Sequence, residues 1–138
     1  MVNGNEEFVG SDTGKLSVLL QKVGSGSPGP EIQVQNVLWK DDKLQLQVLI
    51  SNPKKGDVLN LALVAKATEN LIPRGENNGI TLKGSNVVGV FKQLDSPTFI
   101  NTIELNQVEN SKKEDIDLIT FIQDKKTHEV ISVGALGF

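Results

Sequence analysis

The sequence predicts a mainly β protein: an antiparallel β-sandwich preceded by a small β–β–α segment. Three observations support this class. Apolar and polar residues alternate along most of the chain after residue 30, as in strands that bury one face. Turn signals rich in Gly, Asn and Pro recur between these runs, at a spacing typical of about seven or eight strands. Tyr is absent and Trp occurs once, so the core must consist of Val, Leu and Ile, which favour strands.

The first part of the chain, residues 1–24, predicts two short strands and a helix. Asn3–Gly4 is a tight-turn signal, and residues 7–9 fit a returning strand. Ser11 or Asp12 can cap the helix. The apolar residues of the helix fall at helical spacing: Leu16, Leu19, Leu20 and Val23. This segment is too small to fold alone, so its apolar face needs a partner, and a homodimer through Leu16–Leu20 is one possibility.

A flexible linker, residues 25–30, separates that segment from the sandwich domain, residues 31–138. The linker is rich in Gly and Ser, and its two prolines prevent continuation of the helix. The expected strands of the sandwich follow in chain order: 31–39, 43–50, 58–67, 80–82, 98–105, 116–124 and 128–136. The strand at 58–67 is apolar on both faces, which predicts a central position. Residues 86–94 fit either a strand or a short helix.

Composition and charge exclude several classes of protein. The net charge is −3 and the basic pairs are scattered, whereas binding to nucleic acid requires clustered Lys and Arg. No stretch reaches the roughly 18 apolar residues of a membrane-spanning helix. The chain has no cysteine, so it cannot form disulfides, catalyse thiol chemistry or build a cysteine zinc site. We therefore expect no nucleic-acid partner, no membrane span and no cofactor.

Catalytic and metal-binding patterns are also absent. His128 is the only histidine, and it lies beside Lys125 and Lys126 in an expected turn, without a Ser or Cys nucleophile motif. Asp115 and Asp117 fall on one face of a strand but lack the pattern of a calcium loop. These observations predict no catalytic residue and no metal site. Trp39 is expected to be a packing anchor near a strand end.

The stretch "LIPRGENNGITLKGSNVVGVF", residues 71–91, contains the candidate binding residues. They are polar side chains within or near a glycine-rich loop: Arg74, Glu76, Asn77 and Asn86. In one interpretation Arg74 holds a carboxylate or phosphate, and the neighbouring side chains add an acceptor and an amide. In the other, the glycines permit tight turns, and Arg74 pairs with Glu76 or with a carboxylate on another strand. The sequence leaves both interpretations open.

The same stretch carries a family resemblance. "RGENNGITLKGSNVV" resembles the RGENxGxxLxxxNVV pattern of a family of bacterial, usually secreted, thioredoxin-like proteins of unknown function. The ending "DLITFIQDKKTHEVISVGAL" resembles the closing hairpin of that family, and residues 1–23 resemble the last hairpin and helix of a thioredoxin fold. The chain departs from the family at positions that are often basic there, which are Ile80, Gly84 and Gly89.

The resemblance implies that this chain is the C-terminal part of a periplasmic or secreted protein. Residues 1–24 would complete a thioredoxin-like domain whose redox cysteines lie upstream, and residues 31–138 would be a non-catalytic accessory or interaction domain. Its partner would be another protein or the missing thioredoxin-like domain. Two alternatives remain: an inert fragment of a thiol-disulfide oxidoreductase, and a purely structural domain.

Overall fold

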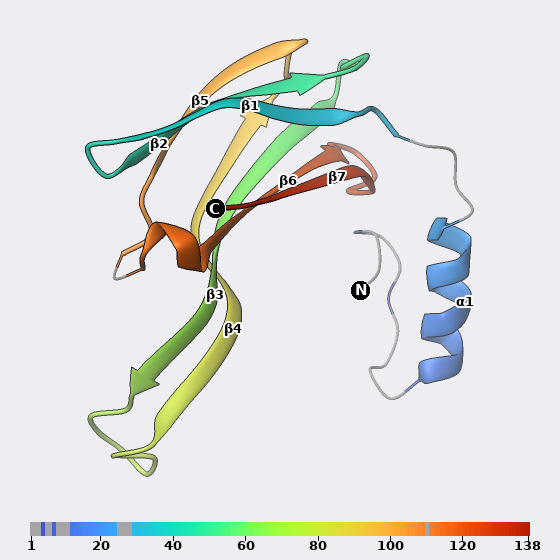
Figure 1. The fold of residues 1–138 in the computed structure, drawn as a ribbon. Coiled ribbons are helices and arrows are strands. Elements are labelled where there is room, and N and C mark those ends of the chain that lie inside the picture. Colours follow the sequence, from blue (N-terminus) through green and yellow to red (C-terminus); the bar gives the residue numbers. More distant parts are fainter. Residues whose placement is uncertain (1–3, 5–6, 8–11, 25–28, 110) are drawn as a thin grey trace.

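The computed structural model describes residues 4, 7, 12–24, 29–109 and 111–138, and its described strands form two antiparallel sheets that face each other (Figure 1). This architecture confirms the predicted mainly β class. The strands are β1 (Ile32–Lys40), β2 (Lys43–Ile50), β3 (Asp57–Leu71), β4 (Thr81–Asp95), β5 (Ile100–Asn106), β6 (Ile116–Asp124) and β7 (Val130–Gly137). A short 3-10 helix, η1 (Lys113–Asp115), precedes β6.

One sheet has three strands in the order β1-β2-β5, and the other has four in the order β4-β3-β6-β7. Hairpins join β1 to β2, β3 to β4 and β6 to β7. The chain changes sheets after β2, β4 and β5, so each sheet contains segments from both halves of the domain. The predicted final hairpin is confirmed as β6 and β7. The short strand predicted at 80–82 and the ambiguous segment at 86–94 belong instead to the single long strand β4.

The core lies between the two sheets, where every second side chain of each strand points inward. Its buried apolar residues come from the strands of both sheets and from the β5–β6 connection: Leu44, Leu46, Val48, Ile50, Leu59, Leu61, Leu63, Ile103, Leu105, Val108, Ile116, Leu118 and Ile122. β3 lies between β4 and β6, and its residues from Asp57 to Ala65 are buried on both faces. The prediction of a central strand there is confirmed.

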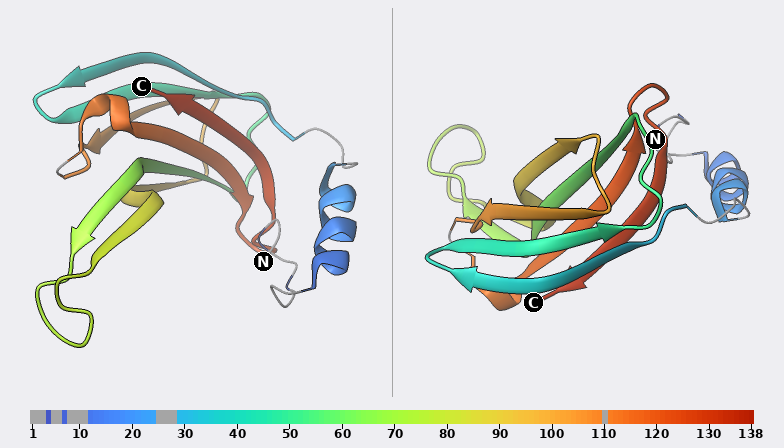
Figure 2. Two further views of the ribbon diagram at one scale, coloured as in Figure 1. Left: turned by 60° about the horizontal axis from the view of Figure 1, so that its bottom comes forward. Right: turned by 90° about the horizontal axis from the view of Figure 1, so that it is seen from above.

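The helix α1 (Thr13–Gly24) stands apart from both sheets in every view (Figures 1 and 2). The Asp12 carboxylate accepts a hydrogen bond from the Lys15 amide at 2.9 Å, which confirms the predicted cap. Leu19 is buried, but Leu20 is 56% exposed. The strands predicted around Asn3–Gly4 fall largely on residues outside the described part of the chain. Within the described part, no helix has the length and apolar character needed to cross a membrane.

The β3–β4 hairpin extends well beyond the sandwich (Figures 1 and 2). β3 pairs with β6 only from Asp57 to Ala65, but it continues to pair with β4 as far as Leu71, opposite Thr81. Residues 66–86 therefore form a two-stranded projection, which we call the arm. The candidate binding loop lies at its tip.

Candidate functional site

The tip of the arm is a turn closed by backbone hydrogen bonds. The Ile72 amide donates to the Ile80 carbonyl, and the Gly79 amide donates to the Ile72 carbonyl, both at 2.9 Å. Gly75 and Gly79 have φ angles of +88° and +82°, a conformation that glycine adopts without strain. A β-carbon at either glycine would meet no atom within 4 Å. These glycines are therefore required by backbone conformation and not by close packing.

Three of the four candidate side chains lie together in this turn. Arg74, Glu76 and Asn77 are all exposed, and within the described residues their side chains make no hydrogen bond or ion pair. The pairing of Arg74 with Glu76 or with a carboxylate on another strand, which was one of the two interpretations, is not formed among the described residues. The turn is held by its backbone alone, which leaves all three polar side chains available to a partner.

The fourth candidate, Asn86, lies apart from the other three at the base of the arm. It follows Ile80 by six positions along the chain, which corresponds to about 20 Å at the rise of a β-strand. Its φ angle is +54°, and Asn is one of the few residues besides glycine that adopt this conformation readily. The structure therefore gives Asn86 a conformational role where the arm leaves the sandwich.

The base of the arm is bent by a β-bulge. Leu63 pairs with Val90 and Val64 pairs with Val88, so Gly89 is the extra residue on β4. Gly89 packs against the Val108 side chain from the β5–β6 connection: a β-carbon at position 89 would lie 2.3 Å from Val108 Cγ1. A β-carbon at Gly84 would lie 2.7 Å from Thr68 Oγ1. A side chain at either glycine would therefore require its neighbour, Val108 or Thr68, to move.

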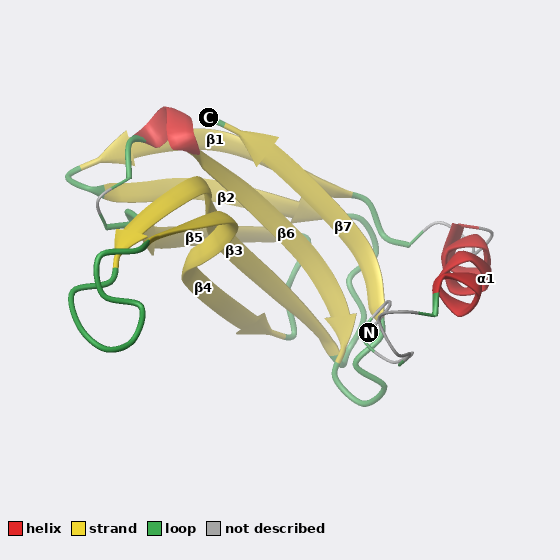
Figure 3. Ribbon diagram, turned by 90° about the horizontal axis from the view of Figure 1, so that it is seen from below, coloured by secondary structure: helices red, strands yellow, loops and turns green. Residues whose placement is uncertain are grey.

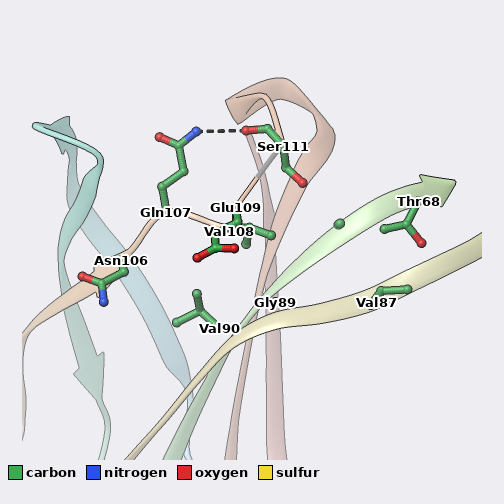
Figure 4. A pocket seen from close by; sticks show the side chains of 10 residues that line it. Thr68, Val87, Gly89, Val90, Asn106, Gln107, Val108, Glu109 and Ser111 are labelled. Carbon is green, nitrogen blue, oxygen red and sulfur yellow. Dashed lines mark hydrogen bonds between the residues drawn. The ribbon is translucent and has the colours of Figure 1, made fainter. Parts of the chain in front are cut away.

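A pocket of about 380 Å³ opens between the base of the arm and the β5–β6 connection (Figure 4). Thr68 contributes from the arm and Val87 from β4 directly after it, and Asn106 and Glu109 contribute from the opposite side. The Gln107 side chain donates to the Ser111 carbonyl at 2.9 Å, so that amide supports the connection. The remaining polar side chains are the hydroxyls of Thr68 and Ser111, an amide and a carboxylate, which suit a small polar molecule. Sequence reasoning missed this pocket because it joins segments distant in the chain.

A second hollow, of about 470 Å³, lies on the other side of the same connection. It shares residues 106–109 with the first and adds the β1–β2 turn at Asp41–Asp42. Next to this turn, Lys43 Nζ lies 2.6 Å from Glu104 Oε1. That hydrogen bond raises the pKa of Lys43, and together with one from Gln45 it lowers the pKa of Glu104. The ion pair joins two partly exposed side chains on the neighbouring strands β2 and β5.

Three other residues of chemical interest, His128, Asp124 and Trp39, line neither hollow. His128 lies exposed in the β6–β7 turn with a φ of +61°. The Asp124 carboxylate accepts hydrogen bonds from the Thr127 and Lys126 amides of that turn, and these bonds lower the pKa of Asp124. Trp39 packs edge-on against Phe138 with ring centroids 5.5 Å apart, which confirms it as a packing anchor. Among the described residues, no group of three or more acidic or histidine side chains could hold a metal ion.

Comparison with known proteins gives one match, to a family model. No curated protein matches the chain, and no solved structure matches it. The family model is described as a protein of unknown function, DUF1223, and it matches residues 1–123. The match covers the helix α1, the arm with its tip and the strands up to β6. The chain therefore belongs to the DUF1223 family of proteins of unknown function.

Proposed function

We propose that this chain carries a non-catalytic interaction domain that binds a protein partner through the tip of the arm. The observation that supports this most directly is the exposure of apolar side chains at the tip. Leu71, Ile80 and Leu82 are 65%, 50% and 55% exposed. Leu82 pairs with Asn70 and Leu71 pairs with Thr81, so Leu82 and Leu71 lie on opposite faces of the arm. Exposed apolar side chains on a projecting segment, with polar groups beside them, are typical of a protein contact surface.

The chemistry of the tip indicates what kind of partner fits. Arg74 can donate two parallel hydrogen bonds to a carboxylate, and Glu76 and Asn77 add acceptors and an amide. β6 stops at the level of Ala65 and β4 is an edge strand, so the outer edges of the arm present unpaired backbone groups within the described residues. An extended protein segment can add to such an edge as a further strand. The best-fitting partner is an extended segment with apolar side chains and a carboxylate.

We place this domain next to a thioredoxin-like domain in a periplasmic or secreted protein, on the basis of the sequence resemblance. The family match supports an association between the two parts of this chain, because it begins at residue 1 and extends into the sandwich. If the whole protein were a thiol-disulfide oxidoreductase, this part would be inert by itself, since it has no thiol. A purely structural domain is the remaining alternative, and it would not need an exposed, polar tip.

Peptide selection tests the proposed function. A library of extended peptides is displayed and selected against the purified chain, with a variant whose residues 72–80 are replaced by a two-residue Asn-Gly turn used to remove arm-independent binders. We expect selected peptides to bind the wild type and to lose at least tenfold in affinity on Arg74→Ala or Leu82→Ser. Phe99→Ser is the matched control, because Phe99 is 57% exposed but lies outside the arm.

Two results would overturn the proposal. One is a failure to select any peptide that distinguishes the wild type from the shortened arm. The other is a thermal-shift screen in which an organic acid or phosphate raises the melting temperature of the wild type but not of Arg74→Ala. That second result would make the tip a small-anion site.

A further inference from the structure

The four-stranded sheet has a second apolar face, directed away from the core. Figure 3 shows the molecule from the side of this sheet. Strand pairing places large apolar side chains from three of its strands on this side: Val88, Phe91, Ile119, Phe121 and Val133. We call these five residues the outer face. Val88, Phe91 and Val133 are 53%, 52% and 65% exposed, whereas Ile119 and Phe121 are half-buried.

The outer face contains an aromatic pair and one buried polar side chain, and that side chain is hydrogen-bonded. The rings of Phe91 and Phe121 lie 6.5 Å apart, on strands that flank β3. Asn60, fully buried beneath them, accepts a hydrogen bond from Gln93 at 2.7 Å and donates to the Val58 carbonyl. A partner that covers this face would therefore find the Asn60 side chain already hydrogen-bonded, which avoids the cost of burying an unpaired amide there.

Charges at the two ends of the outer face are paired within the chain. Lys66 lies 3.3 Å from Asp117 at one end, and Lys125 lies 3.2 Å from Asp95 at the other. Each end therefore has no net charge, although the whole chain carries −3. Because these charges are paired, an identical face brought against this one meets no like-charge repulsion from them. A strongly charged partner would find no unpaired opposite charge in these two pairs. Among possible partners, this arrangement favours a second copy of the chain.

The size of the sheet also suits a dimer. Four strands at about 4.8 Å spacing and nine residues at about 3.4 Å rise give a flat area of about 600 Å². Side chains that project from the sheet increase its accessible area, towards the roughly 800 Å² per partner of a standard interface. Two twisted sheets pack face to face at about 30° and about 10 Å apart. We propose that two copies of this chain associate through their outer faces, with the Phe91 and Phe121 rings at the centre of the contact.

Analytical ultracentrifugation of the full chain across a concentration series tests this proposal. We expect a reversible dimer, and we expect Phe91→Lys and, independently, Val133→Lys to weaken it at least a hundredfold. Phe99→Lys is the control, since it places the same charge at an equally exposed Phe outside the outer face. Urea unfolding of each variant verifies that it remains folded. A wild type that stays monomeric at millimolar concentration, or a dimer insensitive to both outer-face variants, overturns the proposal. Loss of the dimer in the Phe99→Lys control also overturns it.

A distance measurement addresses the geometry directly. The chain has no cysteine, so Lys126→Cys, in the exposed β6–β7 turn and outside the outer face, introduces a unique site for a spin label. At a concentration where the chain is dimeric, pulsed electron resonance should give one label-to-label distance below about 40 Å, the span of two stacked sheets estimated from strand and sheet spacings. Only long or unresolved distances would contradict the face-to-face arrangement. Neither experiment involves the arm tip, so failure here leaves the peptide-binding proposal intact.

Discussion

The side chain of Val108 occupies the space that a β-carbon at position 89 would need, since the two would lie 2.3 Å apart. Val108 is buried and belongs to the core, although it lies in the connection between β5 and β6. This contact joins the bulge at the base of the arm to the rest of the sandwich. It sets where the arm leaves the sheet and forms one side of the pocket in Figure 4.

Gly89→Ala should therefore destabilise the protein, by about 1–3 kcal/mol in the free energy of unfolding, as is usual when a core is overpacked. Urea denaturation monitored by Trp39 fluorescence measures the change. Val108→Ala in the same chain removes the two nearest carbons, so the double variant should be less destabilised than the sum of the single variants. Strict additivity of the two changes would show that the contact does not constrain the base of the arm.

The fold class and most of the strands could be predicted because their signals are local. The alternation from Lys43 to Ile50 and the doubly apolar run in β3 each specify a buried face without reference to other segments. The full length of β4 could not be predicted in this way. Residues 86–94 fitted either a strand or a short helix, because the bulge residue Gly89 interrupts the alternation within the strand.

The candidate site was only partly predictable for the same reason. The tip turn is encoded locally by Gly75 and Gly79, so Arg74, Glu76 and Asn77 could be grouped from sequence. Asn86 is also polar, but its distance from the other three depends on the length of the arm. That length is not encoded near Asn86 in the sequence. The outer face depends on strand order, which links β4 to β6 through β3. A signal for it was nevertheless present: within residues 116–124 the run from Leu118 to Ile122 is apolar at every position except Thr120, unlike a strand with one solvated face.

Gly79→Ala should loosen the tip of the arm without unfolding the sandwich. A left-handed conformation costs an alanine about 1–2 kcal/mol, which corresponds to roughly a 5- to 30-fold change in a local opening equilibrium. Hydrogen exchange of the Ile72 amide, which donates to Ile80, should accelerate by that factor. Gly79→Asn should have a smaller effect, because Asn adopts this conformation more readily. Equal exchange rates in all three proteins would mean that the tip does not hold this turn in solution.

Arg74→Ala should leave stability almost unchanged, within about 0.5 kcal/mol, because the exposed guanidinium has no partner in the described residues. The midpoint of urea unfolding provides the measurement. Lys66→Ala is the useful comparison, since it removes an ion pair with Asp117 and a hydrogen bond to the Glu114 carbonyl. A loss above about 1 kcal/mol for Arg74→Ala would indicate a structural pair, and would weaken the case for a partner-binding tip.

Glu104→Gln should alter the dependence of stability on acidity. The hydrogen bond from Lys43 lowers the pKa of Glu104 in the folded chain, whereas an unfolded Glu titrates near about 4.3. The stabilisation by ionised Glu104 is therefore present above about pH 4.3 and is lost as pH falls through the folded pKa. Urea unfolding at pH 3–7 should show a difference between wild type and variant that shrinks towards pH 3. Glu76→Gln serves as control, and a difference constant with pH would contradict the assignment.

Removal of the first 28 residues should leave a cooperatively folded sandwich. Every residue of the core cluster lies between Leu44 and Ile122, and β1 begins at Ile32. The contacts that anchor the start of this domain are retained: Ser132 donates to the Pro30 carbonyl at 2.6 Å, and Gly29 packs against the Ile131 carbonyl. We expect residues 29–138 to unfold in one transition, with a midpoint near that of the full chain. A broad transition, or loss of the dispersed amide signals of β6 and β7, would instead show that α1 and the residues before it are part of the folding unit.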